Sequence, residues 1–192
     1  MDLKGKKIIL ASASPRRREI LGGLNIEFTV DTNNNFEEVL DLSLPHEELP
    51  AAMAEGKSLG FHRELSDDEI LITADTLVLC DDEVMGKPKD EEDARRMLHR
   101  LSAKAHKVIT AVSIRNNLKH TTFKDISYVY FKALSEEEIS YYIDNFKPFD
   151  KAGAYGIQEW IGYIGIERIE GSFFNIMGLP IHAIYKELQN FI

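Results

Sequence analysis

The sequence predicts a mixed α/β fold, in which helices flank a central mixed β-sheet. Short apolar runs of strand composition alternate along the chain with segments whose apolar residues recur at helical spacing. Capping and turn residues stand between them. The 192 residues contain no repeat and no low-complexity linker, so they indicate one domain, residues 1–192, or one domain with two lobes.

The first three elements are expected to be a strand, a helix and a second strand. The apolar run 8–11 predicts a short buried strand. Ser14 is a good N-cap, and Pro15 suits the first helical position because its fixed φ is helical. The helix that starts there is expected to end at the glycine pair 22–23, a C-cap signal. Residues 26–32 are expected to form the second strand.

The middle of the chain is expected to hold a loop, a helix and a long apolar strand. Two prolines place residues 41–50 in a loop. Residues 51–65 predict a helix, although its two glycines weaken it. Residues 70–80 form an apolar run of β type, which is interrupted by a single acidic residue, Asp75.

The remaining elements follow from caps, turns and periodicity. They are, in order, a helix from Asp90, hairpin strands at 107–115 and 120–132, a capped helix from Ser135, a glycine-rich stretch 153–165 that contains strand material, and a terminal helix after Gly178-Leu179-Pro180. These elements complete the alternation of strands and helices on which the predicted fold class depends.

Composition restricts the class of protein. With 44% apolar and 29% charged residues, the chain has the composition of an ordinary soluble globular protein. No run of about 18 apolar residues predicts a membrane span. The single cysteine, Cys80, excludes an internal disulfide, and a cytoplasmic location is expected. A net charge of −9 argues against a general nucleic-acid binder. The sequence leaves a homodimer open.

A basic turn at the start of the first helix is the clearest sign of function. Arg16, Arg17 and Arg18 follow one another where the helix dipole is positive and acidic residues would be more stable. Cations gathered there favour a bound anion, held by backbone N–H groups and guanidinium groups together. A phosphate-bearing ligand is therefore predicted. The alternative interpretation is a cluster of solvated arginines.

Asp75 is the second candidate because it stands inside an apolar run. A charged residue in a buried strand is costly unless it is paired or bound to a metal. The alternative is a strand that ends at Ala74, with Asp75 capping a turn. The residues alone favour neither interpretation.

Other candidates are weaker when judged from the residues alone. Lys87 stands between a glycine and a proline, a stiff loop that can aim its ammonium group at a phosphate, and Lys57 lies on a predicted helix. A solvated lysine is the ordinary interpretation of both. Glu37 begins an acidic pair in which Glu38 is also eligible. The amide of Gln158 offers a donor and an acceptor for a base edge, although an ordinary glycine-rich loop explains it as well.

Several of these segments, taken in order, resemble the Maf family of nucleoside triphosphate pyrophosphatases. The matching segments, which together span about residues 8–180, are Ser12-x-Ser14-Pro15-Arg16-Arg17, Ala54-x-x-Lys57, Ala74-Asp75-Thr76, Gly86-Lys87-Pro88, Lys151–Gln158 and Gly171–Pro180. Ser58 departs from the alanine that the family commonly has after the lysine.

The resemblance implies a fold and a chemistry. The implied fold is Maf/ITPase-like, with two lobes and a cleft, and the implied reaction is metal-assisted attack of water at the α-phosphorus with Mg²⁺ or Mn²⁺ as cofactor. Asp75 would be the catalytic acidic residue, as base or as metal ligand, and Glu37 would assist with the metal. The implied phosphate ligands are Ser12, Arg16, Lys57 and Lys87, and the residues implied to tune base choice are Arg16, Thr76 and Gln158.

The residues after Lys151-Ala152-Gly153 distinguish two branches of the family. One branch, which handles 7-methyl-GTP, has Ser-Phe there. The other, which handles dTTP and UTP, reads Ala-Tyr-Gly-Ile-Gln, as residues 154–158 do here. Hydrolysis of dTTP and UTP is therefore expected, with modified pyrimidine nucleotides as further candidates. Glu159-Trp160 departs from the glycine and small residue usual in that branch, which leaves the base preference partly open.

Two other functions remain as alternatives. One is a non-enzymatic regulator of cell division or septum formation, in which the same basic turn binds nucleotide or DNA. The other is a house-cleaning pyrophosphatase for purine nucleotides such as ITP, from a related fold. The pyrophosphatase activity on pyrimidine nucleotides is the main prediction because the branch-specific segment favours it.

Overall fold

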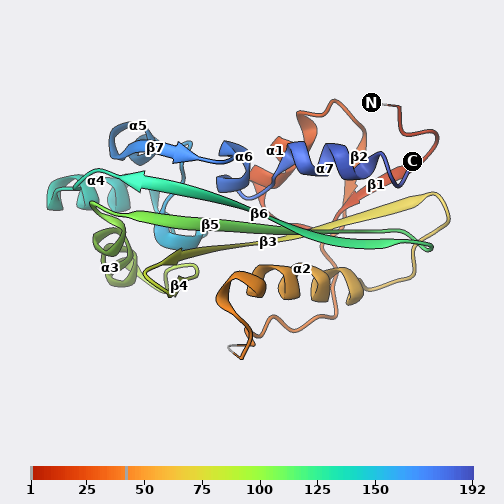
Figure 1. Ribbon diagram of the computed structural model, residues 1–192, viewed down its shortest axis with the longest axis horizontal. Coiled ribbons are helices and arrows are strands. Elements are labelled where there is room, and N and C mark those ends of the chain that lie inside the picture. Colours follow the sequence, from red (N-terminus) through yellow and green to blue (C-terminus); the bar gives the residue numbers. More distant parts are fainter. Residues whose placement is uncertain (1, 42) are drawn as a thin grey trace. The chain divides into compact units, whose positions relative to one another are not determined.

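The computed structural model describes residues 2–41 and 43–192 (Figure 1). Its helices are α1 (Pro15–Gly22), α2 (Leu49–Leu59), α3 (Glu91–Leu101), α4 (Glu136–Phe146), α5 (Trp160–Gly165), α6 (Phe173–Ile176) and α7 (Ile181–Leu188), with 3₁₀ turns η1 (His46–Glu48) and η2 (Ala152–Ala154). Its strands are β1 (Lys7–Leu10), β2 (Phe28–Val30), β3 (Glu69–Cys80), β4 (Glu83–Met85), β5 (Ala105–Arg115), β6 (His120–Phe131) and β7 (Ile166–Glu170).

The strands form one mixed sheet in the order β2-β1-β3-β5-β6-β7, and β4 pairs with β3. β1 runs parallel to both β2 and β3, whereas β4 is antiparallel to β3 and β7 is antiparallel to β6. Helices flank the strands in Figure 1. The predicted mixed α/β class with helices on a central mixed sheet is confirmed.

The chain divides into two compact units. The first unit comprises the described residues up to Asp75, Thr110–Asp125 and Gly178–Ile192, and the second comprises Thr76–Ile109 and Ile126–Met177. Three strands, β3, β5 and β6, have residues in both units. No helix within the described residues is long and apolar enough to cross a membrane.

The first unit is built on the buried strand β1 and on α2, which packs against β3. Thr73, which is fully buried on β3, donates a hydrogen bond from Oγ1 to the carbonyl oxygen of Ala54 at 2.6 Å. The prediction of a helix over 51–65 was too long, since α2 ends at Leu59. In the expected loop 41–50, η1 forms and α2 begins at Leu49; Leu42 lies outside the described residues.

Gly56 within α2 and Gly60, the residue that caps its C-terminus, allow a loop to lie directly on the helix. A Cβ atom added at Gly56 would stand 2.3 Å from the ring of Phe36, and one at Gly60 would stand 2.7 Å from the Cβ of Phe36. Asn34 fixes the same loop by donating from Nδ2 to the carbonyl oxygen of Lys57 at 2.6 Å. The glycines that weaken the helix by sequence therefore have a packing role, and they position the acidic residues that follow Phe36.

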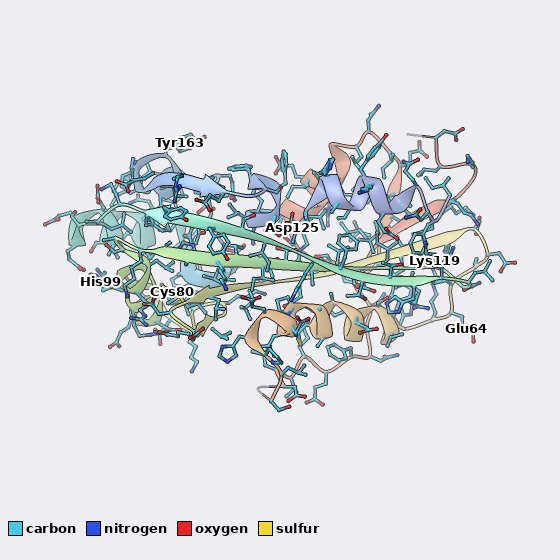
Figure 2. The ribbon with its side chains drawn as sticks, viewed as in Figure 1. Glu64, Cys80, His99, Lys119, Asp125 and Tyr163 are labelled. Atoms are coloured by element: carbon cyan, nitrogen blue, oxygen red, sulfur yellow. The ribbon has the colours of Figure 1, made fainter. Side chains whose placement is uncertain are left out.

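The second unit packs α3 and α4 around one apolar core. Asp90 caps α3 by accepting from the backbone N–H of Asp93 at 2.8 Å, and Ser135 with Glu138 forms the predicted capping box of α4. Cys80, labelled in Figure 2, is fully buried in this core, and burial raises the pKa of its thiol. Cys80 therefore packs as a small core residue.

A buried histidine also belongs to this core. Nε2 of His106 lies 2.7 Å from the hydroxyl oxygen of Tyr155. Burial lowers the pKa of His106 to about 3, because the charged imidazolium is poorly solvated there. His106 is therefore neutral near neutral pH and serves packing.

Two strand predictions differ from the structure. The second strand is shorter than the expected 26–32, covering Phe28–Val30. The strand expected within 153–165 lies after that stretch, as β7 at Ile166–Glu170, and α5 occupies the end of the stretch instead. The hairpin strands, by contrast, end and begin within two residues of the expected bounds.

Candidate active site

The basic turn has the predicted strand–turn–helix form. Ser14 caps α1, and its side chain accepts a hydrogen bond from the backbone N–H of Arg17 at 3.4 Å. Pro15 is the first helical residue, and the first turn of α1 carries no acidic side chain. The positive end of the helix dipole is thus surrounded by cationic side chains, the arrangement that favours an anion.

Arg17 holds three segments of the first unit together. Its Nε donates to the carbonyl oxygen of Gly178 at 2.8 Å, and its Nη1 donates to the carbonyl oxygen of Ala74 at 2.8 Å. Nη1 also lies 3.4 Å from Oγ of Ser12. Burial lowers the pKa of Arg17, while the Asp75 carboxylate opposes that change. Arg17 therefore fixes the backbone beside Asp75.

Sequence analysis did not identify this role of Arg17. Its two strongest partners are backbone carbonyl groups, which every residue type carries, so no side-chain pattern could reveal them. The contact at Gly178 ties the segment that precedes α7 to the basic turn.

Asp75 lies within the continuous strand β3, which runs from Glu69 to Cys80. The alternative of a strand that ends at Ala74 is therefore wrong. Asp75 and its neighbour Thr76 are the only half-buried residues within a stretch of β3 that is otherwise buried from Ile70 to Cys80, in the part of the chain described here. An acidic side chain that is 21% exposed thus interrupts a strand that is otherwise buried.

Lys57 brings two carboxylates together in the first unit. Its Nζ lies 2.7 Å from Oδ1 of Asp75 and 3.2 Å from Oε2 of Glu38. The side chains of Lys57 and Asp75 are 16% and 21% exposed, whereas that of Glu38 is 61% exposed. We call these three residues the Lys57 cluster. It joins a helix, a strand and a loop that are far apart in sequence.

The two members of the acidic pair differ in their contacts. Glu38 makes the ion pair with Lys57, and Glu37 is an exposed residue of the same loop. The assignment of Glu37 to a metal stays a prediction.

The donor set of the Lys57 cluster fits Mg²⁺ or Mn²⁺. The described residues contain no group of three or more His, Cys, Asp or Glu side chains that could hold a metal. Mg²⁺, however, is commonly bound by one or two carboxylates together with substrate phosphates and water. Asp75 and Glu38 supply two such carboxylates around one ammonium group.

Three further predicted residues, Thr76, Lys87 and Gln158, belong to the second unit. Lys87 is exposed in the loop after β4, and Thr76 is half-buried on β3. The backbone N–H of Gly153 donates to the carbonyl oxygen of Gly86 at 3.1 Å, so the segment 151–158 is tied to the Gly-Lys-Pro loop. Two motifs that are far apart in sequence are therefore neighbours within this unit.

Gln158 carries an unusual buried acceptor. Its Oε1 atom is buried and has no hydrogen-bond partner in the part of the chain that the structure describes. The residue also lines a pocket of about 410 Å³ in the second unit, with Tyr163, Ile166 and Phe173 among its walls. An unpaired buried acceptor costs about 1–3 kcal/mol, and a donor that gained access to this atom would recover that free energy.

The structure thus groups the candidates by unit. In the first unit, Ser12 contacts Arg17, which contacts the residue before Asp75, and Asp75 contacts Lys57. Arg16 follows the helix N-terminus in the same turn. In the second unit, the loop of Lys87 is joined to the segment that ends with Gln158.

Comparison with known proteins identifies the family of this chain. The model of the family described as Maf-like protein matches residues 7–191. A protein of Parabacteroides distasonis named dTTP/UTP pyrophosphatase is 50% identical over 190 residues, covering 99% of this chain and 98% of its own. Proteins with the same name from Phocaeicola vulgatus (50% over 188 residues, 98% of this chain and 97% of its own) and Porphyromonas gingivalis (46% over 192 residues, 99% and 96%) are similar throughout.

The matches cover both units and all the motifs that sequence analysis singled out. Similarity of this extent fixes the family independently of any single motif. The chain belongs to the Maf family.

Proposed function

We propose that this protein hydrolyses dTTP and UTP to the nucleoside monophosphate and pyrophosphate. The observation that carries the proposal is the Asp75 carboxylate, which is half-buried within β3 and lies 2.7 Å from the ammonium group of Lys57. A carboxylate beside a cation, next to a helix N-terminus with basic side chains, suits a reaction that activates water beside a polyphosphate. The names of the similar proteins support the same activity.

In the proposed reaction, water attacks the α-phosphorus and the bond to the bridging oxygen of the β-phosphate breaks. Asp75 accepts a proton from the water, and pyrophosphate leaves with the bond's electron pair. Lys57, Ser12, Arg16 and Lys87 hold phosphate oxygens, and their positive charge offsets the charge that develops in the transition state. Ser12 contributes its hydroxyl as a neutral donor.

A divalent cation, Mg²⁺ or Mn²⁺, would neutralise the triphosphate and lower the pKa of a bound water. Asp75 and Glu38 would hold it, with Glu37 as the alternative partner from the same loop. If Asp75 binds the metal instead, a neighbouring water molecule accepts the proton from the attacking water. The two roles of Asp75 share the requirement for a carboxylate.

Base choice is proposed to rest on Gln158, Thr76 and Arg16. The unpaired Oε1 atom of Gln158 can accept from the N3–H group of thymine or uracil, and its amide N–H can donate to a ring carbonyl. Cytosine has no N3–H, so it would leave the acceptor unpaired. Unpaired buried groups are an effective means of rejecting a wrong base.

We further propose that the two units act as one domain, residues 1–192, in the cytoplasm. The family match runs through both units, and β3, β5 and β6 have residues in each. A homodimer stays a prediction, which light scattering of the purified protein would check.

The test of the activity is a panel of nucleotides with pyrophosphate release as the readout, in Mg²⁺ and in Mn²⁺. We expect the highest kcat/KM for dTTP and UTP. A preference for ITP would favour the purine-type enzyme, and a preference for 7-methyl-GTP would favour the other family branch. Binding of nucleotide or DNA without pyrophosphate release from any triphosphate would favour the non-enzymatic regulator.

A further inference from the structure

Glu159, where this chain departs from its expected branch, makes a set of contacts within the second unit. Its Oε1 lies 3.1 Å from Nζ of Lys151, and its Oε2 accepts a hydrogen bond from the hydroxyl of Tyr142. The Lys151 side chain is only 9% exposed, and Tyr142 is fully buried on α4. Asp150 also pairs with Lys151, at 2.6 Å, but it is 56% exposed. Glu159 is thus the inner counter-charge of a nearly buried cation.

These contacts reach the backbone of the turn that carries Gln158. The N–H of Gly156 donates to the hydroxyl oxygen of Tyr142 at 2.9 Å, and the N–H of Glu159 donates to the carbonyl oxygen of Gly156 at 3.0 Å. We call Lys151, Glu159, Tyr142 and the Gly156 amide the Lys151 network. It holds the turn 156–159 from both its start and its end.

The turn is also packed tightly around its glycine. A Cβ atom at Gly156 would stand 2.8 Å from Cδ of Glu159 and 3.1 Å from Nε2 of Gln158. The Glu159 carboxylate and the Gln158 amide therefore both pack against Gly156. A shift of the carboxylate would alter the space in which the amide is held.

Recognition by an unpaired acceptor requires that the acceptor stay in place. A mobile amide would rotate until its oxygen accepted from another donor. A base without an N3–H group would then leave no acceptor unpaired, and the site would not reject it. Supporting contacts that lock a recognition side chain are a general requirement of such sites. The Lys151 network provides contacts of this kind around Gln158.

We propose that Glu159 is a positioning residue for base recognition. Through Lys151 and Tyr142 it fixes the turn 156–159, and so it sets the preference for bases that carry an N3–H donor. This inference rests on the proposed function, in which Gln158 reads the base. Glu159 itself touches neither the substrate nor the reacting atoms in this proposal.

The test compares kcat/KM for dTTP with kcat/KM for CTP in the full-length protein. Glu159→Gln keeps the shape of the side chain and its acceptor for Tyr142, but it removes the charge opposite Lys151. We expect the dTTP:CTP ratio to fall about tenfold, mainly through a higher KM for dTTP, since contacting residues couple by about that much. The kcat for dTTP should change far less.

Tyr142→Phe is the second variant, and it keeps the test decisive if Glu159→Gln does not fold. It removes the hydroxyl that joins Glu159 to the Gly156 amide, and the ratio should fall in the same direction. Tyr141→Phe is the matched control on the same helix. Its ring, whose centroid lies 4.7 Å from that of Trp160, is kept and only an exposed hydroxyl is lost, so the ratio should not change.

The outcomes separate the positioning role from the function on which it rests. Equal losses of kcat/KM for dTTP and CTP, with a lower Tm by circular dichroism, would indicate a merely structural role and overturn the inference. An unchanged ratio in both variants, in an enzyme that prefers dTTP, would overturn the inference and leave the proposed function standing. A wild-type protein that hydrolyses no triphosphate would overturn the proposed function itself, and the inference with it.

Discussion

In the Lys57 cluster of the first unit and around Lys151 in the second unit, a lysine pairs with one inner and one exposed carboxylate, yet the inner carboxylates differ in what else they contact. Their exposures match: the inner Asp75 and Glu159 are 21% and 20% exposed, and the outer Glu38 and Asp150 are 61% and 56% exposed. Glu159 is also bonded to the fully buried Tyr142, whose hydroxyl accepts from the backbone N–H of Gly156. Removing one partner from such a buried set is strongly unfavourable, because the others are left unpaired.

The difference indicates a division of labour. The Lys57 cluster has the properties needed for chemistry on a charged substrate, and the Lys151 network has those needed to hold backbone in one conformation. Lysine–carboxylate pairs of similar exposure can therefore serve different purposes, and the further contacts of the inner carboxylate distinguish them.

Asp75→Asn should lower kcat for dTTP by about 10²-fold or more, because the variant keeps the size of the side chain but loses the charge. Steady-state kinetics on the best nucleotide would measure the loss, and circular dichroism would verify the fold. Asp125→Asn, on β6 in the same unit, is the matched control (Figure 2). Near-normal turnover in Asp75→Asn would contradict the assigned role.

Arg16→Ala should raise KM for the triphosphate by about ten- to hundredfold, since a charge-assisted contact contributes about 1.5–3 kcal/mol. Arg18→Ala, two positions further along the helix and exposed, should have a smaller effect. Titration calorimetry with a non-hydrolysable dTTP analogue would measure binding directly. Equal and small effects of the two substitutions would mean that the arginines are merely solvated.

Gln158→Ala should reduce the preference for dTTP over CTP about tenfold, and it should affect turnover of the best substrate less. The reason is that alanine removes the buried acceptor that cytosine cannot satisfy. The nucleotide panel provides the measurement. If Gln158 only packs the loop, the substitution will lower Tm and leave the ranking of nucleotides unchanged.

Glu38→Gln should raise the Mg²⁺ concentration needed for half-maximal activity by roughly tenfold, which is the usual effect of removing a residue that supports a metal site. Glu37→Gln should raise it less. The structural reason is that Glu38, and not Glu37, pairs with Lys57 beside Asp75. Activity titrations with Mg²⁺ in the two variants form a matched pair. The reverse order would restore Glu37 as the metal ligand.

Substitution of His106 should have the smallest effect on activity, but it should clearly change how stability depends on pH. Its pKa is about 3 in the folded protein and about 6.5 when unfolded, so between these values the unfolded chain binds a proton that the folded protein does not. The free energy of unfolding should therefore decrease as the pH falls below 6.5, by at most about 1.4 kcal/mol per pH unit from this group.

Urea denaturation of the wild type and of His106→Gln at pH 7 and pH 5 would isolate that contribution. The wild type should lose more stability than the variant between the two values. Identical losses would show that the buried imidazole does not carry the pH dependence. The comparison would also show that the second unit depends on neutral buried groups as well as on the Lys151 network.

Much of the first unit's site could be predicted because its signals are carried by side chains. The basic turn was visible from Ser14 and Pro15, and Asp75 was visible as a charge inside an apolar run. The role of Arg17 could not be predicted, since it bonds to backbone carbonyl groups. The choice of Glu38 over Glu37 as the partner of Lys57 depends on how the loop lies on α2, which neither residue encodes.

The errors in the fold have a similar cause. The residues of α5, rich in isoleucine and glycine with two aromatic residues, have the composition of a strand. Their helical turn depends on contact with the preceding loop, where a Cβ at Gly162 would stand 1.8 Å from the carbonyl oxygen of Ile157. Likewise α2 ends at Leu59 because Phe36 and Asn34 pack where the helix was expected to continue. Such tertiary contacts override local propensity.

The ring of Phe36 on Gly56 has a consequence for anyone who engineers this protein for heat tolerance. Replacing helical glycine with alanine is a standard route to a more stable helix, with a gain of about 1 kcal/mol at an ordinary position. Here the new methyl group would meet the ring at 2.3 Å and push it off the helix, together with the loop that brings Glu38 to Lys57. Gly56→Ala would thus stabilise the helix but displace the loop that carries Glu38. Libraries of thermostabilising variants should therefore keep Gly56.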